Sequence, residues 1–177
     1  GDVMRTVDKL DKIGPDKVRE LLIEGGVDAG KAEEILKFIA ITGSNQEVLT
    51  ALEGYRGRSA AFDLGLDELS TVVRYLGSFG VPAENFAVDL TIARGLDYYT
   101  GTVYETTLLD HPEIGSVCSG GRYDNLAEYY TDRQLPGAGI SIGLTRLFYV
   151  LGEQGMLNPD LPTAPADVLI LPMTEDL

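Results

Sequence analysis

The residue types best suited to chemistry gather between residues 89 and 124. This segment combines Arg94 with the pair Tyr98-Tyr99 and, further along, the string Gly120-Gly121-Arg122-Tyr123-Asp124. Arginine presents a planar fork of N–H donors that suits phosphate or carboxylate, and tyrosine hydroxyls both donate and accept hydrogen bonds. Paired glycines let a backbone approach a ligand closely or adopt positive φ. The segment therefore predicts a binding site, and its alternative is a tyrosine-rich sheet surface with arginine stacked on the rings.

Alternating residues predict the strands that would position this site. Every second residue from Phe86 to Ile92 is apolar, which predicts a strand that delivers Arg94 at its end. β-Branched and aromatic residues predict a second strand over 103–108, paired antiparallel with the first through a short connection bounded by glycines. A third strand is expected over 114–118. The site would then lie on an antiparallel sheet.

Two strings in this segment closely resemble the histidine-specific motifs of the histidyl-tRNA synthetase family, which belongs to the class II aminoacyl-tRNA synthetases. They are Arg94-Gly95-Leu96-Asp97-Tyr98-Tyr99-Thr100-Gly101 and Gly120-Gly121-Arg122-Tyr123-Asp124. A third string, Pro136-Gly137-Ala138-Gly139-Ile140-Ser141-Ile142-Gly143-Leu144-Thr145-Arg146-Leu147, resembles motif 3 of class II synthetases. Thr145 stands where class II proteins often carry Glu, but the arginine is retained. The three strings occur in the family's order.

The resemblance implies an α+β fold: the C-terminal half of a class II antiparallel β-sheet core with a helical insertion domain. Residues 1–83 would form the helical insertion domain and residues 84–157 the C-terminal half of the catalytic core. Residues 158–177 would form a linker and the first strand of a truncated anticodon-binding domain. Because the chain begins without Met, we expect an interior fragment that lacks motifs 1 and 2 and most of the anticodon-binding domain.

The resemblance also assigns roles to individual residues. Arg94 would be catalytic and would hold the α-phosphate and carboxylate oxygens. The histidine-binding residues would be Tyr98, Tyr99, Tyr123, Gly120 and Gly121, and the ATP-binding residues Arg94, Arg146 and Gly143. Other roles are open from the residues alone: Tyr98 could pack inward, Arg146 could form a salt bridge on a helix surface, and Asp97 and Asp124 could stabilise turns.

The activity implied by the resemblance is that of a histidine-tRNA ligase. Its substrates would be histidine, ATP with Mg²⁺, and tRNA(His), and the full-length protein would be a cytoplasmic homodimer, whereas the fragment alone would be inactive. A second hypothesis is a catalytically inactive synthetase-like regulatory or histidine-sensing subunit of histidine biosynthesis. Retention of both Arg94 and Arg146 favours the enzyme. A generic nucleotide-binding module is a third hypothesis, without a P-loop or dinucleotide fingerprint to support it.

The amino-acid composition argues against several other classes of protein. The chain has 177 residues and a formal net charge of −14, which argues against a broad phosphate-neutralising surface for nucleic acid. The lone Cys118 excludes an internal disulfide and fits a reducing cytosol, and with only His111 beside it a structural metal is not expected. No apolar run reaches membrane-spanning length.

Helix signals dominate the first 83 residues. Expected helices begin at Pro15, after Asp28, after Ser44 and at Leu66, with Ser44 and Glu47 forming a capping box. Arg56 and Arg58 beside Tyr55 could suit RNA, but a solvent-facing loop is the favoured interpretation. Towards the C-terminal end the pattern predicts a strand over 138–142, a helix from 144, a proline-rich linker over 152–165 and a strand over 166–171.

Overall fold

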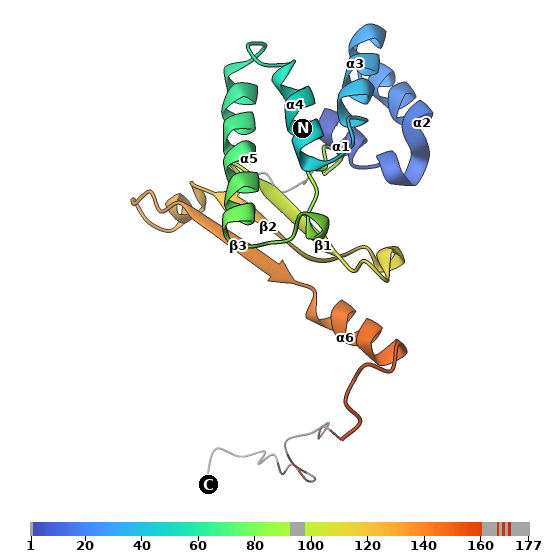
Figure 1. Cartoon of the computed structure of the whole chain (residues 1–177), viewed down its shortest axis with the longest axis vertical. Helices are drawn as coiled ribbons and strands as arrows, with labels where there is room; N and C mark the ends of the chain where they lie inside the picture. Colours follow the sequence, from blue (N-terminus) through green and yellow to red (C-terminus); the bar gives the residue numbers. More distant parts are fainter. Residues whose placement is uncertain (1, 93–97, 161–165, 167, 169, 171–177) are drawn as a thin grey trace. The chain divides into compact units, whose positions relative to one another are not determined.

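The structure is a computed structural model that describes residues 2–92 and 98–160, together with Ala166, Val168 and Ile170. Among these residues, five helices precede the strands, a sixth follows them, and short 3₁₀ turns join the parts (Figure 1). The elements are α1 (Asp2–Val7), α2 (Leu10–Glu24), α3 (Ala29–Ile39), α4 (Asn45–Glu53), α5 (Ala60–Ser78), β1 (Val103–Thr107), β2 (Ser116–Tyr123), β3 (Gly137–Ile142) and α6 (Leu144–Glu153).

Local sequence signals explain where the helices begin. Asp28 caps α3 by accepting hydrogen bonds from the N–H groups of Gly30 and Lys31. Ser44 and Glu47 form the predicted capping box at the start of α4. Within α2 the backbone leaves helical geometry at Gly14, where φ is +79°, so regular helix resumes at Pro15 as predicted. The helix predicted from Leu66 instead begins six residues earlier, at Ala60.

Among the described residues, helices α1 to α5 are held by three small apolar clusters. One joins α4 to α5, which lie side by side in Figure 1, through the buried residues Val48, Leu49, Leu52 and Leu66. The others join α2 to α3 through Val18, Leu22 and Ala32, and α1 to α3 through Val7 and Ile39. Burying a side chain such as Leu22 or Val48 contributes about 1.5–3 kcal/mol. The core of the described chain therefore lies mainly among its helices.

The three strands form an antiparallel sheet in the order β1-β2-β3. In register, Val103 of β1 lies opposite Gly121 of β2, which in turn lies opposite Gly139 of β3. Helices together with an antiparallel sheet confirm the α+β expectation. The predicted strand over 114–118 is shifted: residues 112–114 form a 3₁₀ turn, and β2 continues through both glycines to Tyr123.

The strand predicted from Phe86 to Ile92 is wrong. Residues 86–92 form no strand, although burial alternates from Phe86 to Leu90 as the pattern predicts. Val88 and Leu90 pack against the α4–α5 cluster. Apolar alternation indicates that one face of the segment is covered, whereas a strand also needs a neighbouring strand for its backbone hydrogen bonds. Here the side chain of Asn45, in α4, takes the place of that neighbour. The predicted hairpin connection includes residues 93–97, which lie outside the described residues.

The chain divides into two compact units, residues 1–142 and residues 143–177. The second contains α6, which begins at Leu144 as predicted. Half of the strand predicted over 166–171 lies outside the described residues, and its described members Ala166, Val168 and Ile170 are in no strand. Across the part of the chain that the structure describes, none of the helices is both long and apolar enough to cross a membrane.

Candidate functional site: a tyrosine and glycine face of the sheet

The β2–β3 ladder brings two of the predicted strings together. Tyr123 of β2 lies opposite Gly137 of β3, and Gly121 lies opposite Gly139. Residues directly opposite each other share a face of the sheet, as do alternate residues along a strand. Tyr123, Gly121, Gly137 and Gly139 therefore belong to one face, defined here as the tyrosine face.

On the tyrosine face, the space that glycines leave open is filled by tyrosine rings. A Cβ atom added at Gly121 would lie 2.8 Å from the Tyr99 ring. One added at Gly137 would lie 2.6 Å from the Tyr123 ring, and one added at Gly139 would lie 2.9 Å from the Tyr123 hydroxyl. Real Cβ atoms do not approach so closely, so any larger residue would displace a ring. The glycines thus leave the space in which the Tyr99 and Tyr123 rings are seated against the strands.

Tyr98 joins the same cluster of rings. Its ring centroid lies 4.6 Å from that of Tyr99 and 6.4 Å from that of Tyr123, the latter in an edge-to-face arrangement. Such pairs contribute about 0.5–1.5 kcal/mol beyond the area they bury. Tyr98 remains partly exposed, at 37%. The three tyrosines predicted to bind histidine are therefore brought together, although their contact with a ligand stays a prediction.

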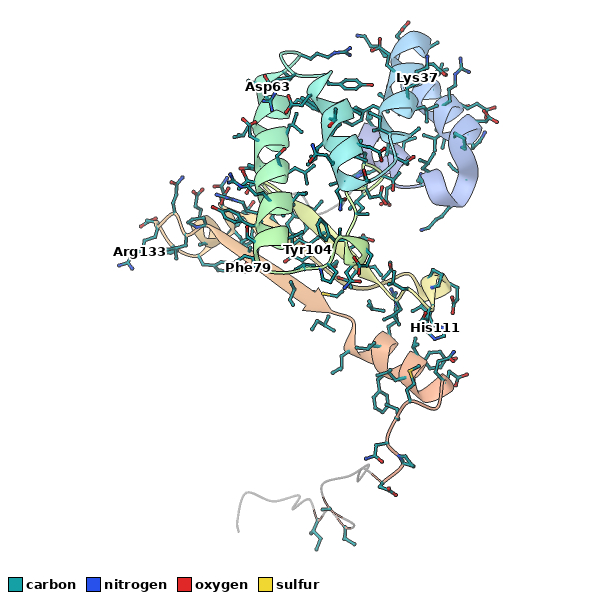
Figure 2. All side chains as sticks on the ribbon, in the orientation of Figure 1. Lys37, Asp63, Phe79, Tyr104, His111 and Arg133 are labelled. Carbon is teal, nitrogen blue, oxygen red and sulfur yellow. The ribbon has the colours of Figure 1, made fainter. Side chains whose placement is uncertain are left out.

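The opposite face carries another tyrosine over another glycine. Tyr104 of β1 lies opposite Gly120 of β2, and a Cβ added at Gly120 would lie 2.6 Å from the Tyr104 hydroxyl. That hydroxyl donates a hydrogen bond to the Gly139 carbonyl oxygen at 2.6 Å, so the side chain, labelled in Figure 2, spans from β1 to β3. Burial raises the pKa of Tyr104, which keeps this donor protonated. Gly120 is thus occupied by protein on this face.

Thr100 and Asp124 fasten the two tyrosine-bearing segments to each other. The Thr100 hydroxyl donates to Asp124 Oδ2 at 2.8 Å and accepts from the Asp124 N–H at 3.0 Å. Arg122 Nε donates to the same carboxylate at 3.0 Å. The Thr100 hydroxyl, with a smaller contribution from Arg122, lowers the pKa of Asp124. The carboxylate is therefore ionised at neutral pH and holds both partners.

The two arginines proposed for phosphate binding are not among the residues that define the tyrosine face. Arg94 and Asp97 lie within residues 93–97, outside the described residues. Arg146 occupies the first turn of α6, as predicted, with Gly143 directly before that helix, in the second compact unit. Their roles towards ATP stay predictions. Among the described residues, no group of three or more His, Cys, Asp or Glu side chains could hold a metal ion.

The basic and aromatic group near the α4–α5 loop is internally paired. Arg56 donates to both carboxylate oxygens of Glu53, at 2.6 and 2.9 Å, and to Asp67 at 2.9 Å. The Arg58 guanidinium carbon lies 4.7 Å from the centroid of the Tyr55 ring. Arg56 is thus paired with two carboxylates in an exposed turn, as the favoured interpretation of a solvent-facing loop expects, and the alternative of an RNA contact stays a prediction.

Sequence reasoning missed the contributions of Tyr104 and Thr100. The sequence predicted Tyr104 only as a strand residue, because no local sequence pattern shows that a side chain will cross β2 to reach Gly139. Thr100 lies within the first motif string, and its partner Asp124 closes the second. One feature of the sequence could have indicated this contact: Thr100 directly follows Tyr99, just as Asp124 directly follows Tyr123. Antiparallel pairing of the two strings would place them opposite each other.

Comparison with known proteins places this sheet in a known family. A sequence model described as histidyl-tRNA synthetase matches residues 4–147. The histidine–tRNA ligase of Clostridium tetani is 51% identical over 175 residues, covering 99% of this chain and 40% of the relative. That of Xanthomonas axonopodis pv. citri is 53% identical over 162 residues, covering 88% of this chain and 34% of the relative.

A solved structure agrees with the sequence comparisons. The crystal structure of histidyl-tRNA synthetase from Nostoc sp. PCC 7120 matches with a TM-score of 0.85 and 44% identity, covering 98% of this chain and 41% of that one. The chain belongs to the histidyl-tRNA synthetase family. It spans 40% or less of the length of the curated relatives described above.

Proposed function

We propose that this chain is part of a histidine–tRNA ligase and that its tyrosine face forms one wall of the histidine pocket. The observation that carries this proposal is the seating of Tyr99 and Tyr123 on one face of the sheet, over glycines of β2 and β3. Hydroxyls held in fixed positions select a polar ligand by its hydrogen-bonding pattern. An imidazole offers one donor and one acceptor in its neutral form, which suits two tyrosine hydroxyls.

The proposed reaction has two steps. In the first, a carboxylate oxygen of histidine attacks the α-phosphorus of ATP, and the bond to the β-phosphate breaks to release pyrophosphate with Mg²⁺. In the second, a terminal ribose hydroxyl of tRNA(His) attacks the histidyl carbonyl carbon, loses its proton, and displaces AMP. Negative charge moves between oxygens in both steps, so fixed cations and donors lower the barriers most.

Each proposed residue has a distinct part in this scheme. Arg94 would hold the α-phosphate and the attacking carboxylate, since a guanidinium fork can contact two oxygens at once. Tyr98, Tyr99 and Tyr123 would surround the imidazole, with Gly121 giving them room, whereas Gly120 would shape this wall by accommodating Tyr104 on its other face. Gly143 and Arg146 would contact ATP. Mg²⁺ would enter with ATP as part of the substrate.

We infer that the rest of the active site lies in sequence beyond this chain, which covers 40% of its Clostridium tetani relative. The full-length protein would act in the cytoplasm as a homodimer. The chain alone would then fold without completing the reaction, because further ATP-binding residues and the dimer contacts would be missing.

The test is histidine-dependent exchange of pyrophosphate into ATP, measured on two proteins. One is this chain alone; the other is a chimera in which this chain replaces the matching segment of the Clostridium tetani ligase. We expect exchange by the chimera and none by the chain alone. Robust exchange by the purified chain contradicts the proposed division of the site. A folded chimera that binds histidine without exchange supports the histidine-sensing alternative instead.

A further inference from the structure

Thr100 and Asp124 each lie directly after one of the two seated tyrosines. Thr100 follows Tyr99, and Asp124 follows Tyr123, the last residue of β2. The two side chains meet just before the start of β1, outside the regular part of the β1–β2 ladder. Whatever fixes Thr100 to Asp124 therefore also limits how far the backbones of the two tyrosines can separate.

The contact is a closed loop of hydrogen bonds. Thr100 Oγ1 donates to Asp124 Oδ2 at 2.8 Å, while Asp124 N–H donates back to Thr100 Oγ1 at 3.0 Å. One hydroxyl thus satisfies both the side chain and the backbone of its partner. Arg122 Nε holds the carboxylate from the other side, at 3.0 and 3.2 Å from its two oxygens. We name Thr100, Arg122 and Asp124 the clasp.

The backbone around the clasp extends the ladder irregularly. Arg122 N–H donates to the Thr102 carbonyl oxygen at 2.9 Å, and Thr100 N–H donates to the Arg122 carbonyl oxygen at 3.0 Å. One residue of β2 therefore faces two residues of the other segment, in the manner of a β-bulge. Bulges re-aim neighbouring side chains, so the position of Tyr99 depends on how this junction is closed.

We propose that the clasp is a positioning device for histidine: it sets the spacing between Tyr99 and Tyr123 without touching the ligand itself. This deepens the proposed function and rests on it. Pockets that recognise a polar group lose selectivity when their donors shift by about 1 Å. Loosening the clasp should therefore raise the KM for histidine while leaving the KM for ATP nearly unchanged, because the clasp joins the two tyrosine-bearing segments and includes none of the residues proposed for ATP.

The experiment compares Thr100→Val with Thr100→Ser in the chimera. Valine keeps the shape and loses the hydroxyl, whereas serine keeps the hydroxyl. We expect Thr100→Val to raise the KM for histidine about tenfold, as for a lost hydrogen bond that misplaces a recognition group, with Thr100→Ser within about twofold of wild type. The KM for ATP should change by less than about twofold in both variants.

A second variant and a second measurement guard against a folding defect. Asp124→Ala should also raise the KM for histidine, and combining it with Thr100→Val should add little, because both remove the hydrogen bond between the Thr100 hydroxyl and the Asp124 carboxylate. In this chain alone, Thr100→Val should speed hydrogen exchange at the Asp124 amide. Exposed Thr106→Val serves as the matched control and should change none of these values.

The outcomes distinguish failure of the proposed function from failure of the role proposed for the clasp. Absence of exchange in the folded wild-type chimera refutes the proposed function, and the role of the clasp within it. Exchange in the wild type, with an unchanged histidine KM in Thr100→Val and in Asp124→Ala, refutes the clasp alone. An equal rise of the KM for histidine and for ATP also refutes it, because a general loosening of the fold would then explain the effect.

Discussion

The side-chain amide of Asn45, the first residue of α4, pairs with the backbone of residues 86–88 as a neighbouring strand would. Asn45 Nδ2 donates to the Phe86 carbonyl oxygen at 3.0 Å, and the Val88 N–H donates to Asn45 Oδ1 at 2.7 Å. Both contacts are partly buried. One side chain thus ties the helical region to the segment that leads towards the tyrosine strings.

Replacing Asn45 by Asp should release this segment without harming α4. Aspartate keeps the acceptor for Val88 but loses the donor and sets a negative charge against the Phe86 carbonyl, whereas a carboxylate in the first helical turn favours the helix. Because the lost bond to Phe86 helps to anchor the segment, residues 86–88 should open more often. Hydrogen exchange at the Val88 amide should therefore accelerate about tenfold, the scale of one lost hydrogen bond. Gln46→Glu makes the same chemical change one residue along and should leave Val88 unaffected. Unchanged Val88 exchange in Asn45→Asp would show that apolar packing alone holds the segment.

Gly120→Ala should destabilise the chain. Its methyl group would collide with the Gly139 carbonyl oxygen and lie 2.6 Å from the Tyr104 hydroxyl, so a strand must shift. We expect a loss of about 1–3 kcal/mol in the free energy of unfolding, as for other overpacked sites. The matched control is Gly65→Ala in α5, where nothing lies within 4 Å of the new Cβ and helix propensity predicts a gain of about 0.5–1 kcal/mol. Urea denaturation measures both, and similar midpoints for the two variants would contradict the packing argument.

Acid should weaken the start of α4 through Glu47. Hydrogen bonds from the Ser44 side chain, then from its backbone N–H, lower the pKa of Glu47 below its usual value. A carboxyl group with a depressed pKa in the folded state contributes stability above its unfolded pKa, near 4.3, and loses it as the pH falls through the folded value. Thermal unfolding of wild type should therefore drop more steeply between about pH 5 and 3 than that of Glu47→Gln. Parallel pH profiles would show that Glu47 does not contribute to the loss of stability in acid.

Tyr123→Phe should weaken histidine use more than ATP use in the chimera. Loss of one hydroxyl from a polar recognition site costs about 1–3 kcal/mol, which corresponds to a rise of roughly 5- to 150-fold in the KM for histidine. Tyr130→Phe, at a ring that is 89% exposed, is the control and should be silent. Initial rates of pyrophosphate exchange, with each substrate varied in turn, give the comparison. An equal loss for both substrates would indicate a damaged fold instead.

Local signals predicted much of the fold, and long-range contacts account for what they missed. The Asp28 cap and the Ser44–Glu47 box were predictable because each depends on residues within three positions. The absence of a strand after Phe86 was not predictable. Its apolar alternation could not reveal that Asn45, 41 positions earlier, would take the place of a strand neighbour. Tyr99 and Tyr123 were predicted as site residues from their motif strings. Their seating on Gly121, Gly137 and Gly139 depends on the β2–β3 register, which no local pattern fixes.

Arg94 is the residue on which an adenylate-forming site in this chain would depend most, so its substitution tests the proposed function. The measurement is single-turnover formation of histidyl-adenylate by the chimera and by its Arg94→Ala and Arg94→Lys variants. We predict that Arg94→Ala slows the step by about a hundredfold or more, the scale of a lost preorganised electrostatic stabiliser. Lysine should restore the rate only in part, because a point charge cannot make a two-pronged contact. A near-normal rate in Arg94→Ala, with the fold intact, would contradict the account.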